Sequence, residues 1–534
     1  MHKAHQKTFK GYALFLVMLL SGIQIIHTMS TYRYGLNLFD EGSILSAAQR
    51  IARGDILYKN IPVVYAPGRY MLLAGLFKIF GQNILVERLM WGTAQLVGVI
   101  FLYPLSKKLM PSFFAFLACI LYIFANGFPH KVFYTALSIP TISLLFIYLD
   151  RGKCKWLILS GVFAGLNLFF MQDTGIFMLA LGICAIFLRQ IHTYRRINLE
   201  GMIRELLIFF APVAAVILPV VFYFYYHNAL GDLVYWCFLW AVGAEVQYGK
   251  IFPKPFFNFI SSGINWNSIH TYLAQQFYYY IPIIIILIVF FVIFRRLIRK
   301  TWDKETSYLL IIFAWGILSL PKWILVPFYL YSLISLLPTY IMGCYLLSLI
   351  YGKAEAMAVN RGYDNKAIKI VIVASLSVFP LFHIYHLIMF MNIQKPQQPL
   401  KLLNIKVAPV YVAQSDANII EGLVSYIDTH TKKNDIIYST TMPGIYFITQ
   451  RPNVMNYEYL APLVLKSSED EKKLVSNVRD KAKYIVHFDF RLDRREKWDF
   501  NDYAPLMNRF LNDGCVMVAQ FGPYKIYKPL KLYN

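Results

Sequence analysis

The chain has 534 residues, of which 58% are hydrophobic and only 15% are charged. Soluble proteins carry about 25% charged residues, so this composition excludes an ordinary soluble enzyme and indicates a membrane protein. The net charge of +23 does not indicate nucleic-acid binding, because Lys and Arg recur in short clusters between apolar runs. The six cysteines follow no metal-ligand spacing and predict no disulfide framework.

A basic segment and an apolar run that begins near Gly11 open the chain. Runs of the length needed to cross a bilayer, about 20 residues, recur from there to His386. Lys and Arg gather in every second connection, which predicts a cytoplasmic N-terminus and an extracytoplasmic C-terminus. We therefore expect a multi-pass protein of the inner (plasma) membrane, with about 11 transmembrane helices in a membrane domain over residues 1–394. The first run is expected to be a span, since no small-residue cleavage site follows it.

The first outer loop, over residues 30–82, contains the candidate catalytic residues. Asp40 and Glu41 precede an amphipathic segment, residues 43–52, which is expected to form a helix on the membrane surface. Asp40 has two interpretations, as the N-cap of this helix or as a functional carboxylate. Lys and Arg are normally scarce on the outer side, so binding of an anion would explain the cations of this loop. These are Arg33, Arg50, Arg53, Lys59, Arg69, Lys78 and, at the end of the loop, Arg88.

The later outer connections add further polar residues. Lys131 lies where the third and fourth spans meet, and Gln172 and Asp173 form the tight turn between the fifth and sixth. A second long outer segment, residues 228–276, is rich in aromatic residues and is expected at the membrane interface. His383 and His386 lie one helical turn apart in the last span, but no third metal ligand accompanies them.

The composition becomes that of a soluble protein at about residue 395. Residues 395–534 are expected to form an extracytoplasmic α/β domain. The pattern predicts strands over 435–439 and 482–488, helical segments over 418–431 and 443–450, and a closing pair of strands within 515–527. A turn at Gly522–Pro523 would join the two strands of that pair.

The first loop resembles that of the GT-C glycosyltransferases in its Asp40–Glu41 pair, its Arg50 and the stretch from Tyr65 to Tyr70, YAPGRY. The resemblance is narrower to the bacterial family-39-like and RgtA/B/C/D-like branch, which is related to protein mannosyltransferases and the lipid A aminoarabinose transferase. Residues 435–452 are similar to the external domains of that branch. The order of spans, loops and external domain matches over nearly the whole chain.

The resemblance implies a glycosyltransferase that moves a sugar from a polyprenyl-phosphate carrier to an envelope glycan, glycolipid or protein on the outer face, with inversion at the anomeric carbon. Asp40 is the candidate general base, and Glu41 a helper or a divalent-metal ligand. Arg69 is the candidate for the lipid phosphate, because arginine binds phosphate through two parallel hydrogen bonds. The expected substrate-binding residues are Arg50, Tyr65, Arg69, Lys131, Gln172 and Asp173.

Two alternatives stay open from the sequence. One is a flippase or transporter of lipid-linked sugars, although such proteins generally need ionisable residues within the bilayer. The other is an O-antigen ligase or polymerase, which concentrates function in a late outer loop. No cofactor is certain, and a divalent metal stays open although His130–Lys131 stands where relatives often have another acid.

Overall fold

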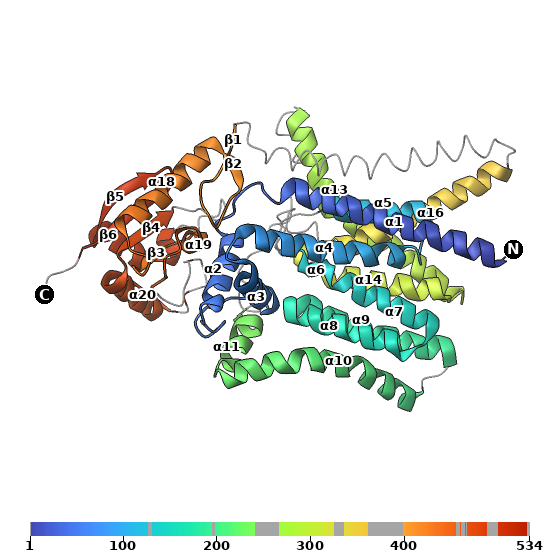
Figure 1. Ribbon diagram of the computed structural model, residues 1–534. Coiled ribbons are helices and arrows are strands. Elements are labelled where there is room, and N and C mark those ends of the chain that lie inside the picture. The colour runs from blue at the N-terminus through green and yellow to red at the C-terminus, as the bar shows by residue number, and fades with distance from the viewer. Residues whose placement is uncertain are drawn as a thin grey trace. The chain divides into compact units, whose positions relative to one another are not determined.

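The computed structural model describes residues 2–125, 131–194, 198–240, 266–324, 336–360, 399–454, 460, 465, 467–488 and 500–530 (Figure 1). The chain forms two compact units. The first, here the helical unit, comprises Met1–Met29, Trp91–Val221 and Glu245–Lys395. The second, the mixed unit, comprises Ser30–Met90, Phe222–Ala244 and Pro396–Asn534. The first outer loop and the C-terminal region therefore belong to one unit, although most of the chain separates them in sequence.

Among the residues that the structure describes, eleven helices lie wholly or mostly in the helical unit. They are α1 (His2–Thr31), α4 (Ile84–Ser106), α5 (Ser112–Phe124), α6 (Phe133–Ala136), α7 (Ser138–Arg151), α8 (Cys154–Phe170), α9 (Gln172–Tyr194), α10 (Leu199–Tyr226), α13 (Trp266–Ile298), α14 (Lys304–Ile324) and α16 (Leu337–Asn360). The ends of α1, α4 and α10 belong to the mixed unit.

Six helical segments within the described part of the chain are long and apolar enough to cross a membrane. They are Tyr12–Thr31, Ile84–Ser106, Phe133–Arg151, Gln172–Ile191, Leu199–Tyr226 and Tyr280–Ile298. All six lie within the stretch from Gly11 to His386 in which spans are expected. The total of about 11 stays a prediction, because the last expected span and the His383–His386 pair lie outside the described residues.

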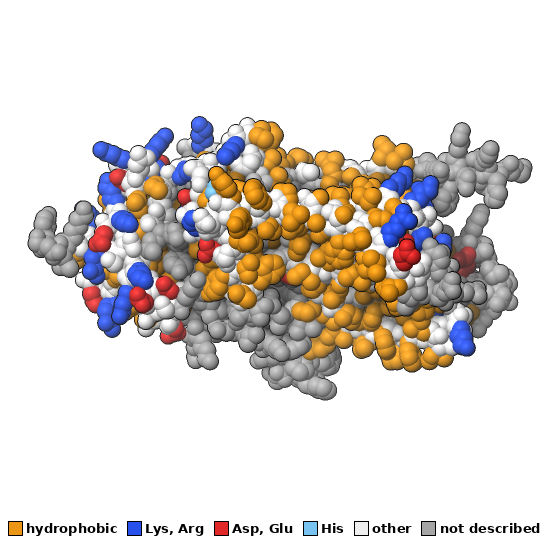
Figure 2. All heavy atoms as spheres, turned by 90° about the horizontal axis from the view of Figure 1, so that it is seen from below, with side chains coloured by type: hydrophobic (Ala, Val, Ile, Leu, Met, Phe, Trp, Pro, Cys, Tyr) orange, Lys and Arg blue, Asp and Glu red, His pale blue; other side chains and the backbone are white. Residues whose placement is uncertain are grey.

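The helical unit is apolar inside and outside. Its core contains fully buried side chains from several helices, such as Leu20, Val99 and Ile142. In contrast, Leu207 and Leu218 of α10 are more than 60% exposed, and hydrophobic side chains cover much of the helical face seen in Figure 2. An apolar exterior over long helices is what a bilayer requires.

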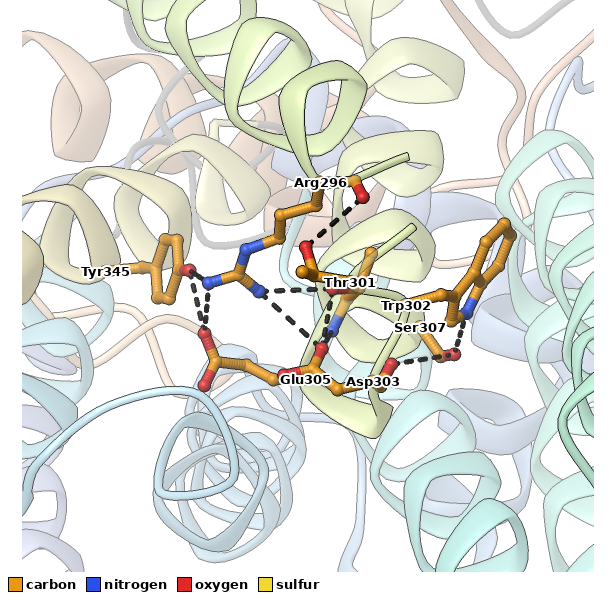
Figure 3. Close-up of polar contacts among 8 residues, drawn as sticks. Arg296, Thr301, Trp302, Asp303, Glu305, Ser307 and Tyr345 are labelled. Carbon is orange, nitrogen blue, oxygen red and sulfur yellow. Dashed lines mark hydrogen bonds and ion pairs between the residues drawn. The ribbon is translucent and has the colours of Figure 1, made fainter. Parts of the chain in front are cut away.

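Polar contacts join helix ends at one end of the helical unit. The Asp150 carboxylate, at the end of α7, binds Lys108 beyond α4 and Lys304 and Tyr308 of α14. Arg296 at the end of α13 contacts Glu305 of α14 and Tyr345 of α16, each at 2.8 Å (Figure 3). The basic connections that follow α4, α7 and α13 thus share one end of this unit, as the alternation of charge predicts.

The mixed unit contains short helices and two small sheets. The helices are α2 (Asp40–Ala52), α3 (Gly68–Phe80), α11 (Leu230–Val234), the π-helical turn η2 (Tyr235–Trp240), α18 (Gln414–His430), α19 (Gly444–Thr449), α20 (Ser468–Lys481), α21 (Phe500–Tyr503) and α22 (Pro505–Asp513). The strands are β1 (Leu400–Leu402), β2 (Tyr411–Ala413), β3 (Ile437–Ser439), β4 (Tyr484–Phe488), β5 (Cys515–Phe521) and β6 (Tyr524–Pro529).

The larger sheet has the strand order β3-β4-β6-β5. β3 and β4 pair in parallel, whereas β6 pairs antiparallel with both β4 and β5. The smaller sheet is the antiparallel pair β1–β2. Each expected strand and helical segment of the C-terminal region overlaps an observed element, and the β5–β6 turn contains Gly522, whose φ is +52°.

Helix α2 is buried within the mixed unit. Its apolar side chains, including Ile44, Leu45 and Ala48, are at most 2% exposed, and the helix packs against α3 and α19. The amphipathic pattern of residues 43–52 predicts this helix correctly, but protein rather than lipid covers the apolar face. The close approach to α19 requires a glycine at position 42, because a Cβ on Gly42 would lie 2.6 Å from the Cα of Gly444.

Candidate functional site

Asp40 is the first residue of α2 and not its N-cap. The N-cap position belongs to Phe39, which makes no side-chain capping bond. The side chain of Asn37 instead accepts hydrogen bonds from the backbone N–H groups of Phe39 and Asp40, at 3.0 and 2.9 Å. Asp40 is half-buried in the first helical turn, where the helix dipole favours a carboxylate. Asn37 therefore satisfies two backbone N–H groups at the start of the helix, and Asp40 is the first helical residue.

Glu41 forms a buried ion pair with Arg88, in the first two turns of α4. Nε of Arg88 lies 2.6 Å from Oε1 of Glu41, and Nη2 lies 2.8 Å from Oε2. The other N–H groups of Arg88 donate to the carbonyls of Tyr32, Tyr34 and Gly35, at 3.0, 3.1 and 2.8 Å. Arginine has five N–H donors, so its hydrogen-bonding capacity is filled. The pair fixes the loop that leads into α2.

Arg50, at the other end of α2, also fixes a loop through an ion pair and a hydrogen bond to a backbone carbonyl. Its Nε lies 2.6 Å from Oδ2 of Asp55, and its Nη2 donates to the carbonyl of Asn60 at 3.1 Å. The Asn60 side chain accepts from the backbone N–H of Ile56 at 2.8 Å. These contacts shape the turn that carries the chain from α2 toward the YAPGRY stretch.

Arg69 lies in the first turn of α3 and is 1% exposed. Its guanidinium carbon lies 4.3 Å from the centroid of the Tyr65 ring, within cation–π distance. Glu87 of α4 is fully buried, and both of its carboxylate oxygens have no hydrogen-bond partner among the described residues. Arg69, Arg88 and Glu41 are all close enough to Glu87 to act on it electrostatically. Two acids and two guanidinium groups therefore occupy one buried region.

The other three expected site residues belong to the helical unit. Lys131 is 3% exposed, with its Nζ 5.7 Å from the Tyr134 ring centroid. Gln172 and Asp173 begin α9. The buried side chain of Asn167 links the start of α9 to the segment that contains Tyr134. It accepts a hydrogen bond from Thr174 at 2.8 Å and donates one to Ser138 at 2.7 Å. Ser138 in turn donates to the Tyr134 carbonyl at 3.1 Å.

The structure thus groups the expected site residues in two sets. Asp40, Glu41, Arg50, Tyr65 and Arg69 lie in the mixed unit, and Lys131, Gln172 and Asp173 in the helical unit.

Sequence reasoning missed the residues that organise each set. No sequence motif marks Asn37, Glu87 or Asn167. The one available signal was Glu87, because an acid beside Arg88 at the start of a span is unusual. Nothing in the sequence connects Tyr58 with Cys237, whose side chains touch in the mixed unit.

No group of three or more His, Cys, Asp or Glu side chains gathers among the described residues. Glu41, the expected metal ligand, has both carboxylate oxygens bonded to Arg88. A divalent metal stays a prediction from the sequence.

Comparison with solved structures identifies the fold. The oligosaccharyltransferase AglB from Archaeoglobus fulgidus, solved with an inhibitory peptide and a dolichol-phosphate, matches with a TM-score of 0.55 and 12% identity, over 98% of this chain and 74% of that one. The same enzyme solved with Zn and sulfate matches with a TM-score of 0.55 and 11% identity, over 97% of this chain and 73% of that one. ArnT from Cupriavidus metallidurans, in its apo state, matches with a TM-score of 0.52 and 11% identity, over 97% of this chain and 98% of that one.

No protein-family model and no curated protein matches the sequence. The structural matches therefore establish the fold alone, and this fold is the one that GT-C glycosyltransferases share. The expectation of a GT-C fold is confirmed.

Proposed function

We propose that this chain is a membrane glycosyltransferase that moves a sugar from a polyprenyl-phosphate carrier to an acceptor hydroxyl on the outer face of the membrane. The observation that carries the proposal is that one unit of a GT-C fold contains both an aspartate in the first turn of α2 and a buried arginine held over an aromatic ring. AglB, which shares the fold, is solved with a dolichol-phosphate and an inhibitory peptide, and this supports a lipid-phosphate donor.

Asp40 is the proposed general base. It would accept the proton of the acceptor hydroxyl as the oxygen attacks the anomeric carbon, while the bond from that carbon to the phosphate oxygen breaks. A single displacement of this kind inverts the anomeric centre. The electron pair of the broken bond leaves with the polyprenyl phosphate, so cations must stabilise the departing group.

Arg69 is the proposed partner of that phosphate. Burial strengthens its electrostatic effect, and the planar guanidinium offers parallel N–H groups that match phosphate oxygens. Arg50 and Tyr65 are assigned to the donor side of the site. Lys131, Gln172 and Asp173, which belong to the helical unit, stay candidate sugar ligands from the sequence alone. Glu41 is assigned to support Asp40 through its ion pair with Arg88.

The proposed location is the inner (plasma) membrane, with the N-terminus cytoplasmic and the C-terminal α/β region outside. The clustering of basic helix ends at one end of the helical unit supports this orientation. The external α/β region is proposed to position the acceptor. Reporter fusions after Arg196 and after Asn534 should show opposite sidedness, and equal sidedness would refute the orientation.

The function is tested with Asp40→Asn in a purified-protein assay that offers a panel of labelled polyprenyl-phosphate sugars. Asparagine keeps the size of the side chain but cannot accept a proton, so transfer should fall by about 10²–10⁴-fold. Binding of polyprenyl phosphate should change little. Asp513→Asn, an exposed carboxylate at the end of α22, is the matched control and should leave transfer unchanged.

Transfer within a few-fold of wild type in Asp40→Asn would remove Asp40 from the role of base. Movement of lipid-linked sugar across vesicle membranes, with no transfer from any donor in the panel, would favour the flippase alternative instead.

A further inference from the structure

A buried tyrosine lies between two sequence-distant parts of the mixed unit. Tyr58 follows α2, is 1% exposed, and has a φ of +67°. This left-handed conformation is unfavourable for a large side chain, so the surroundings must hold it in place. Its backbone N–H donates to the carbonyl of Ile61 at 2.9 Å, which closes a tight turn just before the YAPGRY stretch.

The Tyr58 hydroxyl is held from both sides. It donates to the carbonyl of Tyr65 at 2.8 Å, and it accepts from the thiol of Cys237 in η2 at 3.2 Å. The Tyr58 ring also packs against Phe224, with centroids 5.2 Å apart. Burial raises the pKa of the Tyr58 phenol well above its usual value and that of the Cys237 thiol to about 11, so both groups keep the protons that they donate.

Tyr65, which accepts this hydrogen bond, also contacts the candidate phosphate ligand, Arg69. The Tyr65 ring lies 4.3 Å from the Arg69 guanidinium carbon, measured to the ring centroid. A continuous series of contacts therefore runs from η2 through Tyr58 and the backbone of Tyr65 to Arg69. Movement of the Tyr65 backbone would tilt the ring and turn the guanidinium plane with it.

We propose that Tyr58 is a positioning residue, which fixes Tyr65 so that its ring orients the Arg69 guanidinium for two-point binding of a lipid phosphate. The inference rests on the proposed function of Arg69. It assigns a role to Cys237 and Phe224 as well, because they hold Tyr58 from a segment that begins more than 150 residues later in the chain. Two-point binding needs a fixed guanidinium plane, whereas a lysine in the same place would act as a point charge.

The test measures the Kd of purified polyprenyl phosphate for the full-length protein in lipid nanodiscs. Tyr58→Phe keeps the ring and removes the hydroxyl, leaving the Tyr65 carbonyl without this donor. We expect the Kd to rise about tenfold, as for the loss of a buried hydrogen bond. Tyr438→Phe is the matched control, since Tyr438 is fully buried in the same unit and its hydroxyl has no hydrogen-bond partner among the described residues.

A double-mutant cycle separates positioning from general destabilisation. Arg69→Lys should weaken binding by itself, and adding Tyr58→Phe to it should change the Kd less than about twofold, because lysine has no plane to orient. If Tyr58→Phe raises the Kd equally in both backgrounds, its role is only structural and the proposal is overturned.

The two levels of the proposal fail in different ways. An unchanged Kd in Tyr58→Phe, together with weak binding in Arg69→Lys, overturns the positioning role and keeps the function of Arg69. An unchanged Kd in Arg69→Lys rules out two-point binding of phosphate by Arg69 and the positioning role of Tyr58 with it. If Tyr58→Phe does not fold, Cys237→Ala replaces it, with an expected rise of about threefold, and an unchanged Kd there overturns the proposal.

Discussion

Two Arg–Glu ion pairs in this chain have nearly the same contact distance and very different surroundings. Arg88 and Glu41 approach to 2.6 Å with side chains 9% and 6% exposed, whereas Arg296 and Glu305 approach to 2.8 Å with side chains 23% and 37% exposed. The first pair joins α4 to α2, and the second joins α13 to the neighbouring start of α14 (Figure 3).

The difference lies in what each arginine does with its remaining donors. Arg88 uses them on three carbonyls of the first loop, so it determines the path of a segment that has no regular structure of its own. Arg296 bonds to side chains, Thr306 and Tyr345, on helices that are already formed. A buried pair that organises a loop is therefore essential to the fold, while a solvated pair between helix ends adds little.

The largest effect is expected from Arg88→Met. It leaves Glu41 buried without its counter-ion, and breaking a buried pair costs about 3–5 kcal/mol. The thermal midpoint of the purified protein should fall accordingly, and the double variant Glu41→Gln/Arg88→Met should recover part of the loss. Single and double variants of equal stability, close to wild type, would contradict the role given to this pair.

An intermediate effect is expected from Gly444→Ala, which tests the packing beside the buried pair. A Cβ at Gly444 would lie 2.8 Å from Cδ2 and 2.9 Å from the backbone of Leu38, in a contact that also involves α2. Overpacking of this kind costs about 1–3 kcal/mol. Gly352→Ala in α16 is the control, since a Cβ at Gly352 would meet no atom of another element within 4 Å, and it should slightly raise the thermal midpoint.

The smallest effect is expected from Glu305→Gln. Exposed ion pairs contribute about 0.2–1 kcal/mol, and Tyr345 keeps a hydrogen bond to Arg296 in the variant. The change in thermal midpoint should shrink further at high salt, because salt screens exposed charges. A loss as large as that of Arg88→Met would show that exposure does not separate the two pairs.

Local features of this fold were predictable from sequence. The spans, the basic connections, the helix after Asp40 and the elements of the C-terminal region each depend on composition and periodicity within a short window. The sequence pattern placed Asp40 just before this helix, whereas Asp40 is its first residue, and the part that Asn37 plays at the helix start was not predictable.

Long-range features were not predictable. The grouping of the first loop with the C-terminal region depends on pairs such as Gly42 with Gly444 and Phe77 with Phe447, whose rings stack at 5.8 Å. A glycine in a helix and a phenylalanine in an apolar segment have ordinary local explanations. The burial of Glu41 was missed for a related reason. Without knowledge of its ion pair with Arg88, an acid next to Asp40 is interpreted as a second solvent-facing site residue.

The contact between Gly42 and Gly444 also sets an order of events during synthesis. The ribosome makes about 5–20 residues per second, so α2 emerges about 20–80 s before its partner α19 exists. Throughout that interval the helix that carries Asp40 has an uncovered surface where α19 will pack. A polypeptide that is released before α19 is made therefore lacks the surface against which α2 packs, so a segment made late decides whether the first loop reaches its final structure.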